Sequence, residues 1–406
     1  MSQSSKKPTL WFECIPDDIV FDLLNHMPVK SLIRFMCVSK SFYSTITSPD
    51  FINKHLHRAK LLSNNNNHNG YLLCKPKPKP KPLFNHNNHK GVLLCKPKPK
   101  PKPVASSSEE ELCTVVYNRD RTLTEICRFK IPFDNVRIVG FCNGIFCYSN
   151  YHSYSYPYCR QDYNGIIYLW NPSIRKFKKI LATPLYKYVS WDTFGFAYHS
   201  QNNEFKVLRL VSFTNEKLLN IIHHVAHVYT SSTNSWRKVD FLLESPITRI
   251  VRSTLFFNGA LHYTAYNGRH RFILSFDLND EIFREITLPQ NLHGTYPLDR
   301  LAVFKGSLAL IRFSNGLCHI WVMREYGVVE SWTEQIVPLE NFDAFIGCTN
   351  SGELLIAKSI NPFQLFSFDP ESRDENNLGI QDLTPEAYTT NFFMDSLVLL
   401  NELELL

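Results

Sequence analysis

The chain has 406 residues, of which 44% are hydrophobic and 14% aromatic, enough apolar content for two or three folded domains. No apolar run reaches the roughly 20 residues of a membrane-spanning helix, and the first residues lack a signal-peptide pattern, so we expect a protein of the cytoplasm or nucleus without a membrane segment. The net charge is +7, but eight of the lysines lie in two local Lys-Pro runs, and the remainder of the chain is near neutral. This distribution argues against a folded nucleic-acid-binding face.

Residues 1–14 form a polar lead that we expect to be disordered, and a region dense in helix signals follows. Pro16 and the two acids after it predict a helix start, because proline fits the first helical turn and acids suit the positive end of a helix. Residues 30–40 predict a second helix, and the serine before Pro49 predicts the cap of a third. The pattern therefore predicts a three-helix module over residues 15–58.

Apolar side chains cover more than one face of this module. The residues concerned are Leu32, Ile33, Phe35, Met36, Val38, Phe42 and Ile46. Three helices in a little over forty residues bury too little surface for a secure core of their own. The second apolar face either packs on the rest of this chain or docks another protein, and the pattern alone favours neither.

Residues 59–110 contain a tandem repeat of 21 residues, in which an Asn- and His-rich stretch leads into the run KPKPKPKP. Alternating Lys-Pro favours extended polyproline II with too few apolar side chains to pack, so we interpret this segment as a low-complexity linker. Three alternatives are a polybasic patch for RNA or acidic lipid, a set of lysines for ubiquitin attachment, and a metal site. The metal ligands would be His68, His86, His89, Cys74 and Cys95. Each copy also begins like a strand, at Gly70 and at Gly91, and only one of the two could occupy a given strand position.

From residue 111 to residue 400 the sequence changes to short alternating strands that repeat. Turns with glycine precede apolar strands, and Gly259, Gly306 and Gly352 are 47 and 46 residues apart, a spacing typical of a four-stranded propeller blade. We expect the aromatic side chain after the second turn of each copy to lie between adjacent blades; examples are Trp170, Trp236 and Phe283.

Five copies of this repeat are visible. Residues 112–117 and 126–131, joined by residues 396–400, could complete a sixth copy. The fold class that the sequence predicts is therefore α+β multidomain, with a small three-helix module followed by an all-β propeller of about six blades over residues 111–400.

The sequence lacks the catalytic signatures GxSxG, GxxxxGK[ST], GxGxxG and HExxH, so we expect a non-catalytic protein without a cofactor. His223, His224 and His227 lie on one predicted strand, where neighbours alternate between faces, and we interpret them as edge or surface histidines. Cys142 and Cys147 flank a turn without a second Cys or His pair for zinc, so we expect two small core residues and no metal.

Residues 15–56 resemble the F-box motif, and the match is nearly continuous. It rests on Ile15-Pro16 with Ile19, Met27-Pro28-Val29-Lys30-Ser31-Leu32, Arg34-Phe35, Cys37-Val38, Lys40-Ser41-Phe42, Pro49, Phe51 and His55-Leu56. The departures from the usual plant pattern are conservative and lie at Ile15, Met27, Ser39 and Phe42. The resemblance implies docking on the Skp-type adaptor of a cullin-RING ubiquitin ligase. We predict that the adaptor contacts Ile15, Pro16, Pro28, Val29, Leu32, Phe35, Val38 and Phe42 through apolar burial.

Most of the region from residue 112 to residue 390 resembles the F-box-associated, kelch-related domain of plant F-box proteins. The motifs are VGFCNGIFC at 139–147, LWNPS at 169–173, FGFAY at 194–198 with EFKV at 204–207, and NSW at 234–236. Within that family, the arrangement is similar to the S-haplotype group of the rose family.

Together, the two resemblances imply a substrate-recognition subunit of an SCF-type ubiquitin ligase. The helices would bind the adaptor and, through it, a cullin, and the kelch-like propeller would bind a target protein for ubiquitination and proteasomal degradation. No small-molecule substrate is implied. The alternatives are a propeller scaffold that works without ubiquitin and a nucleic-acid binder that uses the Lys-Pro insert. A special case of the first function is a pollen self-incompatibility determinant that recognises ribonucleases.

Overall fold

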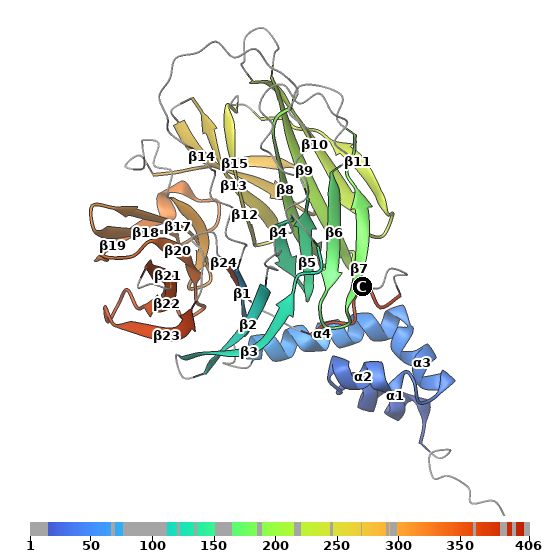
Figure 1. The fold of residues 1–406 in the computed structure, drawn as a ribbon. Coiled ribbons are helices and arrows are strands. Elements are labelled where there is room, and N and C mark those ends of the chain that lie inside the picture. Colours follow the sequence, from blue (N-terminus) through green and yellow to red (C-terminus); the bar gives the residue numbers. More distant parts are fainter. Residues whose placement is uncertain are drawn as a thin grey trace, which may run out of the picture.

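The computed structural model contains an N-terminal helical module and a β-propeller that lies against it (Figure 1). The structure describes residues 15–65, 70–75, 112–119, 122–133, 136–150, 165–184, 189–214, 221–243, 247–268, 270–289, 292, 299–359, 363–381, 388–391 and 395–401. The predicted lead over residues 1–14 and most of the Lys-Pro insert, including all but one of the proposed metal ligands, lie outside these residues.

The helical module has four helices, not the three that the sequence pattern predicts. They are α1 (Asp17–Asn25), α2 (Val29–Phe35), α3 (Lys40–Thr47) and α4 (Pro49–Asn65). The predicted helix over residues 30–40 is divided at Ser39, whose backbone is extended (φ −152°, ψ 156°). The hydroxyl of Ser39 accepts a hydrogen bond from the backbone N–H of Phe42 at 3.1 Å and so caps α3.

The predicted helix starts at Pro16 and Pro49 are confirmed. Pro16 precedes α1 in an extended conformation, and Ser48 Oγ accepts a hydrogen bond from the Phe51 N–H at 3.2 Å at the start of α4. The last helix continues beyond residue 58, so the segment that the sequence analysis assigns to a linker begins with the end of α4.

The propeller consists of six four-stranded antiparallel sheets, and five of them are blades built from consecutive strands. Their strands are β4 (Arg137–Cys142), β5 (Ile145–Ser149), β6 (Ile166–Asn171) and β7 (Lys176–Leu181) in blade 1; β8 (Val189–His199), β9 (Glu204–Thr214), β10 (Ile221–Thr230) and β11 (Ser235–Val239) in blade 2; β12 (Arg249–Phe257), β13 (Ala260–Asn267), β14 (His270–Asp277) and β15 (Phe283–Thr287) in blade 3; β16 (Arg300–Phe304), β17 (Ser307–Ser314), β18 (Leu317–Met323) and β19 (Trp332–Pro338) in blade 4; and β20 (Ala344–Cys348), β21 (Leu354–Ser359), β22 (Phe363–Phe368) and β23 (Glu375–Gln381) in blade 5.

The sixth sheet is a composite of distant segments, so the number of blades with consecutive strands is five, fewer than the expected six or so. Its order is β24 (Tyr388–Asn391), β1 (Gly70–Lys75), β2 (Leu112–Arg119) and β3 (Thr122–Lys130). The first of the two strand-like repeat copies therefore occupies the strand position, between β2 and β24. The prediction that residues 396–400 complete this sheet is wrong, because β24 takes that place. In the later segment, Leu397 and Leu400 pack in the helical core, and Val398 and Leu399 pack on blades 1 and 2.

The sheets stand around a common axis, because the first strand of each blade contacts the first strand of the next, from β4 through β8, β12, β16 and β20 to β24. Tight turns join the paired strands as predicted. At Asn143-Gly144 and Asn258-Gly259, both residues have positive φ, between 47° and 80°. Such turns match the twist of the strands that they join.

Aromatic side chains lie between neighbouring blades, as the repeat predicts. The indole N–H of Trp236 in blade 2 donates to the carbonyl oxygen of Leu181 in blade 1 at 2.8 Å. Phe283 packs on Phe276 and on Phe241, which follows blade 2, with ring centroids 4.7 and 4.6 Å apart. A single four-stranded sheet cannot bury both of its apolar faces, and these contacts between blades help to bury them.

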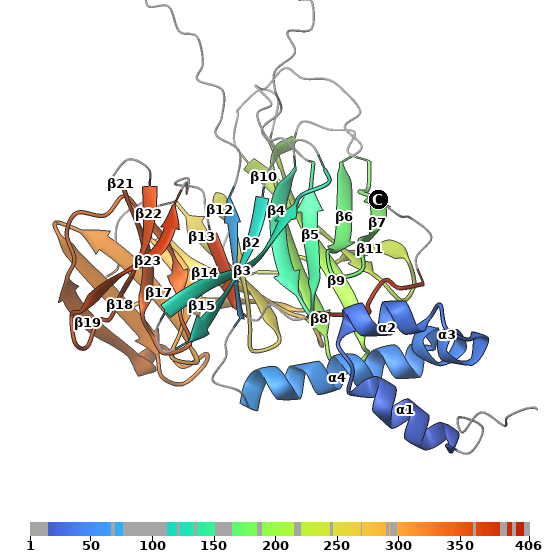
Figure 2. The same ribbon diagram turned by 60° about the horizontal axis from the view of Figure 1, so that its bottom comes forward.

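The helical module lies on one face of the propeller, beside blades 1 and 2 (Figure 2). The turn from β6 to β7 and the turn from β8 to β9 point toward it, since Lys60 of α4 lies 4.0 Å from the ring centroid of Tyr198. We call the opposite side the far face. It carries the ends of β5, β9 and β11 and the beginnings of β6, β10 and β12.

Candidate functional site

The predicted adaptor-contact residues divide into an exposed group and a buried group. Pro16 and Pro28 are exposed, and the side chains of Ile15 and Val38 are 38% and 67% exposed. Phe35 and Phe42 are partly buried and pack edge to face, with ring centroids 5.9 Å apart.

Val29 and Leu32, by contrast, are 0% exposed. They belong to the core of the helical module, together with Leu24, Ile46, Phe51 and two leucines from the end of the propeller. In this conformation both side chains pack against the other helices. Periodicity identifies apolar positions of α2 but does not distinguish its inward from its outward face.

Two exposed apolar areas lie on α1, α2 and α3. The corner between α2 and α3 carries Val38 with the exposed side of the Phe35–Phe42 pair, and Tyr43 beside it is 54% exposed. Along α1, Ile19 and Leu23 are 48% and 55% exposed. Their spacing of four residues places both on one face of the helix.

Ile19, Leu23 and Tyr43 are absent from the predicted contact set. The first two are apolar positions of α1 in the sequence, and the structure shows that α1 packs on the core through Val20, Phe21 and Leu24 without them. Several large apolar side chains on so small a module are typical of a protein-binding surface.

An open groove separates α1 from α4 next to this surface. Its rim is acidic on the α1 side, at Asp17, Asp18 and Asp22, and basic on the α4 side, at Lys54 and Arg58. Lys54 pairs with Asp50 at 3.0 Å and lies 4.9 Å from the ring centroid of Phe21. The charged rim of the groove is favourably solvated by water, whereas the apolar corner between α2 and α3 is not.

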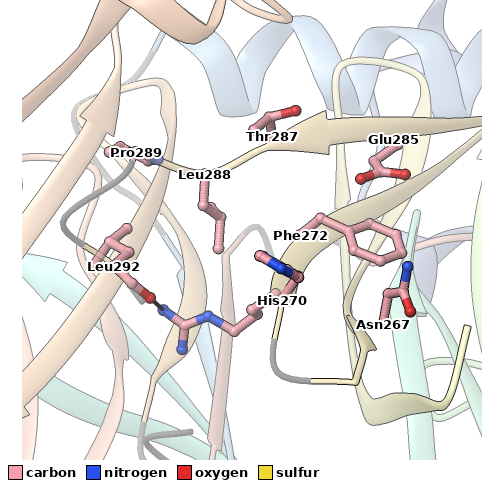
Figure 3. A pocket seen from close by; sticks show the side chains of 9 residues that line it. Asn267, His270, Phe272, Glu285, Thr287, Leu288, Pro289 and Leu292 are labelled. Atoms are coloured by element: carbon pink, nitrogen blue, oxygen red, sulfur yellow. Dashed lines mark hydrogen bonds between the residues drawn. The ribbon is translucent and has the colours of Figure 1, made fainter. Parts of the chain in front are cut away.

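On the propeller, a small cavity opens beside blade 3, near the loops of the far face. Figure 3 shows Leu288, Pro289 and Leu292 on one side of it, and Phe272 with the polar residues Asn267, His270 and Glu285 on the other. Arg271 also lines it.

Behind this cavity, Arg271 and Arg312 share the carboxylate of Asp299, which joins blades 3 and 4. The distance from Arg312 Nη2 to Asp299 Oδ2 is 3.1 Å, and all three residues are buried. Because the Asp299 carboxylate is paired with two guanidinium groups, we interpret the group as ion pairs that fix two blades.

Two cysteines of blade 1 belong to the packed core of the propeller. Burial raises the pKa of the Cys142 thiol to about 12, and that of Cys147 also lies well above its usual value. Both are free thiols. Within the described ranges no group of three or more His, Cys, Asp or Glu side chains is arranged to hold a metal ion.

The three histidines of β10 differ from one another. His223 is exposed and stacks on Phe213, whereas His224 and His227 are partly buried, and burial lowers the pKa of each. His224 Nε2 lies 2.8 Å from the carbonyl oxygen of Ile247, which ties β10 to the connection before blade 3. The expectation of surface histidines thus holds for His223 only.

Comparisons with known proteins agree with this architecture. The F-box domain model matches residues 12–54, and the model of the F-box associated beta propeller domain matches residues 94–400. Among curated relatives, F-box protein At3g07870 of Arabidopsis thaliana is 28% identical over 345 residues, which cover 80% of this chain and 72% of the relative. The F-box/kelch-repeat protein At3g23880 and F-box protein CPR1, both from Arabidopsis thaliana, are each 24% identical. These matches cover 79% and 95% of this chain and 78% and 89% of the two relatives.

None of the helices in the described part of the chain is long and apolar enough to cross a membrane.

Proposed function

Because the chain belongs to the plant F-box proteins with an F-box-associated β-propeller, we propose that it is the substrate-recognition subunit of an SCF-type cullin-RING ubiquitin ligase. The helical module binds the Skp-type adaptor, and the adaptor connects the chain to a cullin. The propeller holds a target protein, which is ubiquitinated and then degraded by the proteasome.

The observation that carries this proposal is the exposed apolar surface of the helical module. Leu23 and Val38 are more than half exposed, although the core beneath them is packed with buried side chains of the helices and of residues 397 and 400. Full burial of one such side chain against a partner stabilises a complex by about 1.5–3 kcal/mol. Two or three of them supply a large part of the free energy of a micromolar complex, which is about 8 kcal/mol.

We place the adaptor contacts on the exposed members of the predicted set and on their neighbours. The contact set becomes Ile15, Pro16, Ile19, Leu23, Pro28, Phe35, Val38, Phe42 and Tyr43. Val29 and Leu32 support this surface from within.

The propeller contributes through proximity and not through chemistry of its own. The helices occupy one face, so a target protein bound on the far face is held at a fixed position relative to the adaptor (Figure 2). A receptor of this kind raises the effective concentration of target lysines near an enzyme that another subunit carries. Strand ends on the far face border long stretches of sequence, as between Ser149 of β5 and Ile166 of β6, and connections on a rigid scaffold are common binding sites.

The test is a binding titration of the full chain with a purified Skp-type adaptor. The double variant Leu23→Asp with Val38→Asp should weaken binding at least tenfold, because each carboxylate would have to be desolvated in an apolar contact. Leu242 provides the matched control, since it is 79% exposed but lies on the propeller. Leu242→Asp should bind as the wild type does. An adaptor affinity that the double variant leaves unchanged would place the interface elsewhere.

A further inference from the structure

Residues 395–401, which follow the last strand of the propeller, complete the core of the helical module. We call them the clasp. Leu397 and Leu400 are 1% and 6% exposed and pack among Leu24, Leu32 and Phe51. Asn401 Nδ2 donates a hydrogen bond to the carbonyl oxygen of Thr47, at the end of α3, at 2.9 Å. Two of the seven fully buried apolar residues of this core therefore come from a segment more than three hundred residues away in the sequence.

The other side of the clasp is bound to blade 1. The side-chain amide of Asn171, which is completely buried, donates to the carbonyl oxygens of Ser396 and Val398, both at 2.8 Å. Lys176 Nζ donates to the carbonyl oxygen of Leu400 at 2.7 Å, and Ser173 Oγ donates to Asp395 Oδ1 at 2.6 Å.

Three of these donors lie on the turn from β6 to β7 or on its flanking strand ends, and Ile174 of the same turn packs on the helical core. The clasp thus lies between the helices and blade 1 and is bonded to both.

The size of the helical module gives this arrangement its importance. The four helices span about fifty residues, a length at which a single core is marginal without further support. Their own leucines and aromatic residues leave space that Leu397 and Leu400 fill. Such buried side chains stabilise the core in two ways: their apolar surface is removed from water, and they fill space that would otherwise be a cavity.

We infer that the helices acquire their adaptor-binding conformation only when the clasp is in place. The clasp follows β24, the strand that closes the composite sheet, so it is synthesised after every strand of the propeller. A chain with an incomplete propeller lacks the clasp and does not dock the adaptor. Adaptor binding therefore reports that the target-binding domain has been made in full. The clasp also fixes the propeller relative to the helices, so the target is presented in one orientation. The part of this inference that concerns adaptor binding rests on the proposed function, and the part that concerns folding does not.

The experiment compares two shortened chains by hydrogen exchange and by adaptor titration. A chain that stops after Asn401 keeps the clasp, and a chain that stops after Met394 lacks it. In the first, amide protection of α1, α2 and α3 and adaptor affinity should equal those of the wild type. In the second, these amides should lose most of their protection, since the helices are then open most of the time. Adaptor affinity should fall in proportion to the fraction of chains that stays competent to bind, about tenfold when that fraction is about one in ten. Blades 2 to 4 should keep their protection in both chains.

Point variants separate loss of the clasp contacts from any wider effect of shortening the chain. Leu397→Ala with Leu400→Ala removes the two buried side chains, and Leu181→Ala with Leu242→Ala is the matched control, because these leucines of the propeller are exposed. The first pair should raise exchange in α2 and α3 and weaken adaptor binding, and the second pair should do neither.

The outcomes distinguish the two proposals. Equal helix protection with and without the clasp would overturn the inference, whatever the adaptor does. A wild-type chain that fails to bind the adaptor, while its helices still lose protection without the clasp, would overturn the proposed function and leave the coupled folding in place.

Discussion

Arg209 of β9 and Asp192 of β8 form an ion pair that is fully buried in blade 2, with 2.8 Å between Arg209 Nη2 and Asp192 Oδ2. Arg209 also donates to the carbonyl oxygen of Thr183, which belongs to the connection from blade 1. Blade 4 repeats the arrangement, since Arg312 of β17 pairs with Asp299 and reaches the carbonyl oxygen of Leu292 at 3.4 Å. In both places a buried arginine ties the connection between two blades to the blade that follows.

The first prediction concerns this pair. Asp192→Ala should lower the free energy of unfolding by about 3–5 kcal/mol, because it leaves the charge of Arg209 buried without its carboxylate. The comparison is Asp280→Ala, which removes a half-exposed partner of Arg284 at 3.2 Å and should cost about 1 kcal/mol or less. Urea denaturation followed by tryptophan fluorescence measures both. Similar losses in the two variants would mean that the buried pair does not stabilise blade 2.

The second prediction concerns Gly195 of β8, which lies against blade 3. A Cβ atom at this position would contact the hydroxyl of Tyr263 and come within 2.8 Å of Leu261 Cδ1. Gly195→Ala should therefore lower the free energy of unfolding by about 1–3 kcal/mol through overpacking. Tyr263→Phe in the same chain removes the hydroxyl and should recover part of this loss. Denaturation midpoints of the single and double variants measure the effect, and a harmless Gly195→Ala would show that the two blades can move apart.

The FGFAY motif around this glycine shows how far sequence reasoning reaches. The motif indicates the family and a strand, and the repeat spacing indicates blades. Neither reveals that the missing side chain is required by residues of the next blade more than sixty positions later. Asp192 and Arg209 are likewise 17 residues apart, and no short motif connects them. Hairpin turns such as Asn143-Gly144 are local and are therefore predictable, whereas contacts between blades depend on the whole ring.

In the helical module, one feature could be predicted from the sequence and another could not. Ser39 could have been recognised as a helix cap, because serine before a new helical period is a known start signal. The clasp could not, since SLVLL at 396–400 has the apolar content of a strand. In the structure β24 occupies the place in the sheet, and Leu397 and Leu400 enter the helical core. The prediction that Val29 and Leu32 contact the adaptor has a related basis, because the sequence of a small helix does not show whether an apolar side chain faces the core or the surface.

The third prediction concerns pH and His262, which is buried between blades 3 and 4. Its Nε2 lies 2.7 Å from the Tyr326 hydroxyl and its Nδ1 3.3 Å from the carbonyl oxygen of Leu255, partners that suit a neutral ring. Burial lowers the pKa of His262 from 6.5 to about 4. The unfolded chain therefore binds a proton more readily than the folded chain between these two values. Stability is complete above pH 6.5 and falls as the pH is lowered toward 4, by up to about 1.4 kcal/mol per pH unit for this one group.

His262→Gln should reduce that slope, because glutamine does not titrate. Burial lowers the pKa of His55, His224 and His227 too, so they contribute with the same sign and part of the pH dependence should persist in the variant. The quantity to compare is the change in unfolding free energy between pH 7 and pH 5 in the two proteins. Equal changes would show that His262 is protonated as easily in the folded chain as in the unfolded one.

The fourth prediction separates the core of the helical module from its surface. Leu32→Ala should weaken adaptor binding indirectly, because a cavity at a fully buried leucine costs about 2–5 kcal/mol and the helices would open more often. Val38→Asp should weaken binding directly and leave the fold intact, because the side chain is already in water. Hydrogen exchange of α1 to α3 in the isolated chain distinguishes the two: it should increase in Leu32→Ala and remain at the wild-type level in Val38→Asp.

A temperature series sharpens this distinction. If Leu32 acts through folding, cooling from 30 °C toward the temperature of maximum stability, often near 10–20 °C, should recover part of the adaptor affinity of Leu32→Ala but none of that of Val38→Asp. Should Leu32→Ala keep full helix protection and still fail to bind, Leu32 would have to turn outward in the complex and contact the adaptor itself. That result would require α2 to rotate away from Leu397 and Leu400, and it would connect adaptor binding to release of the clasp.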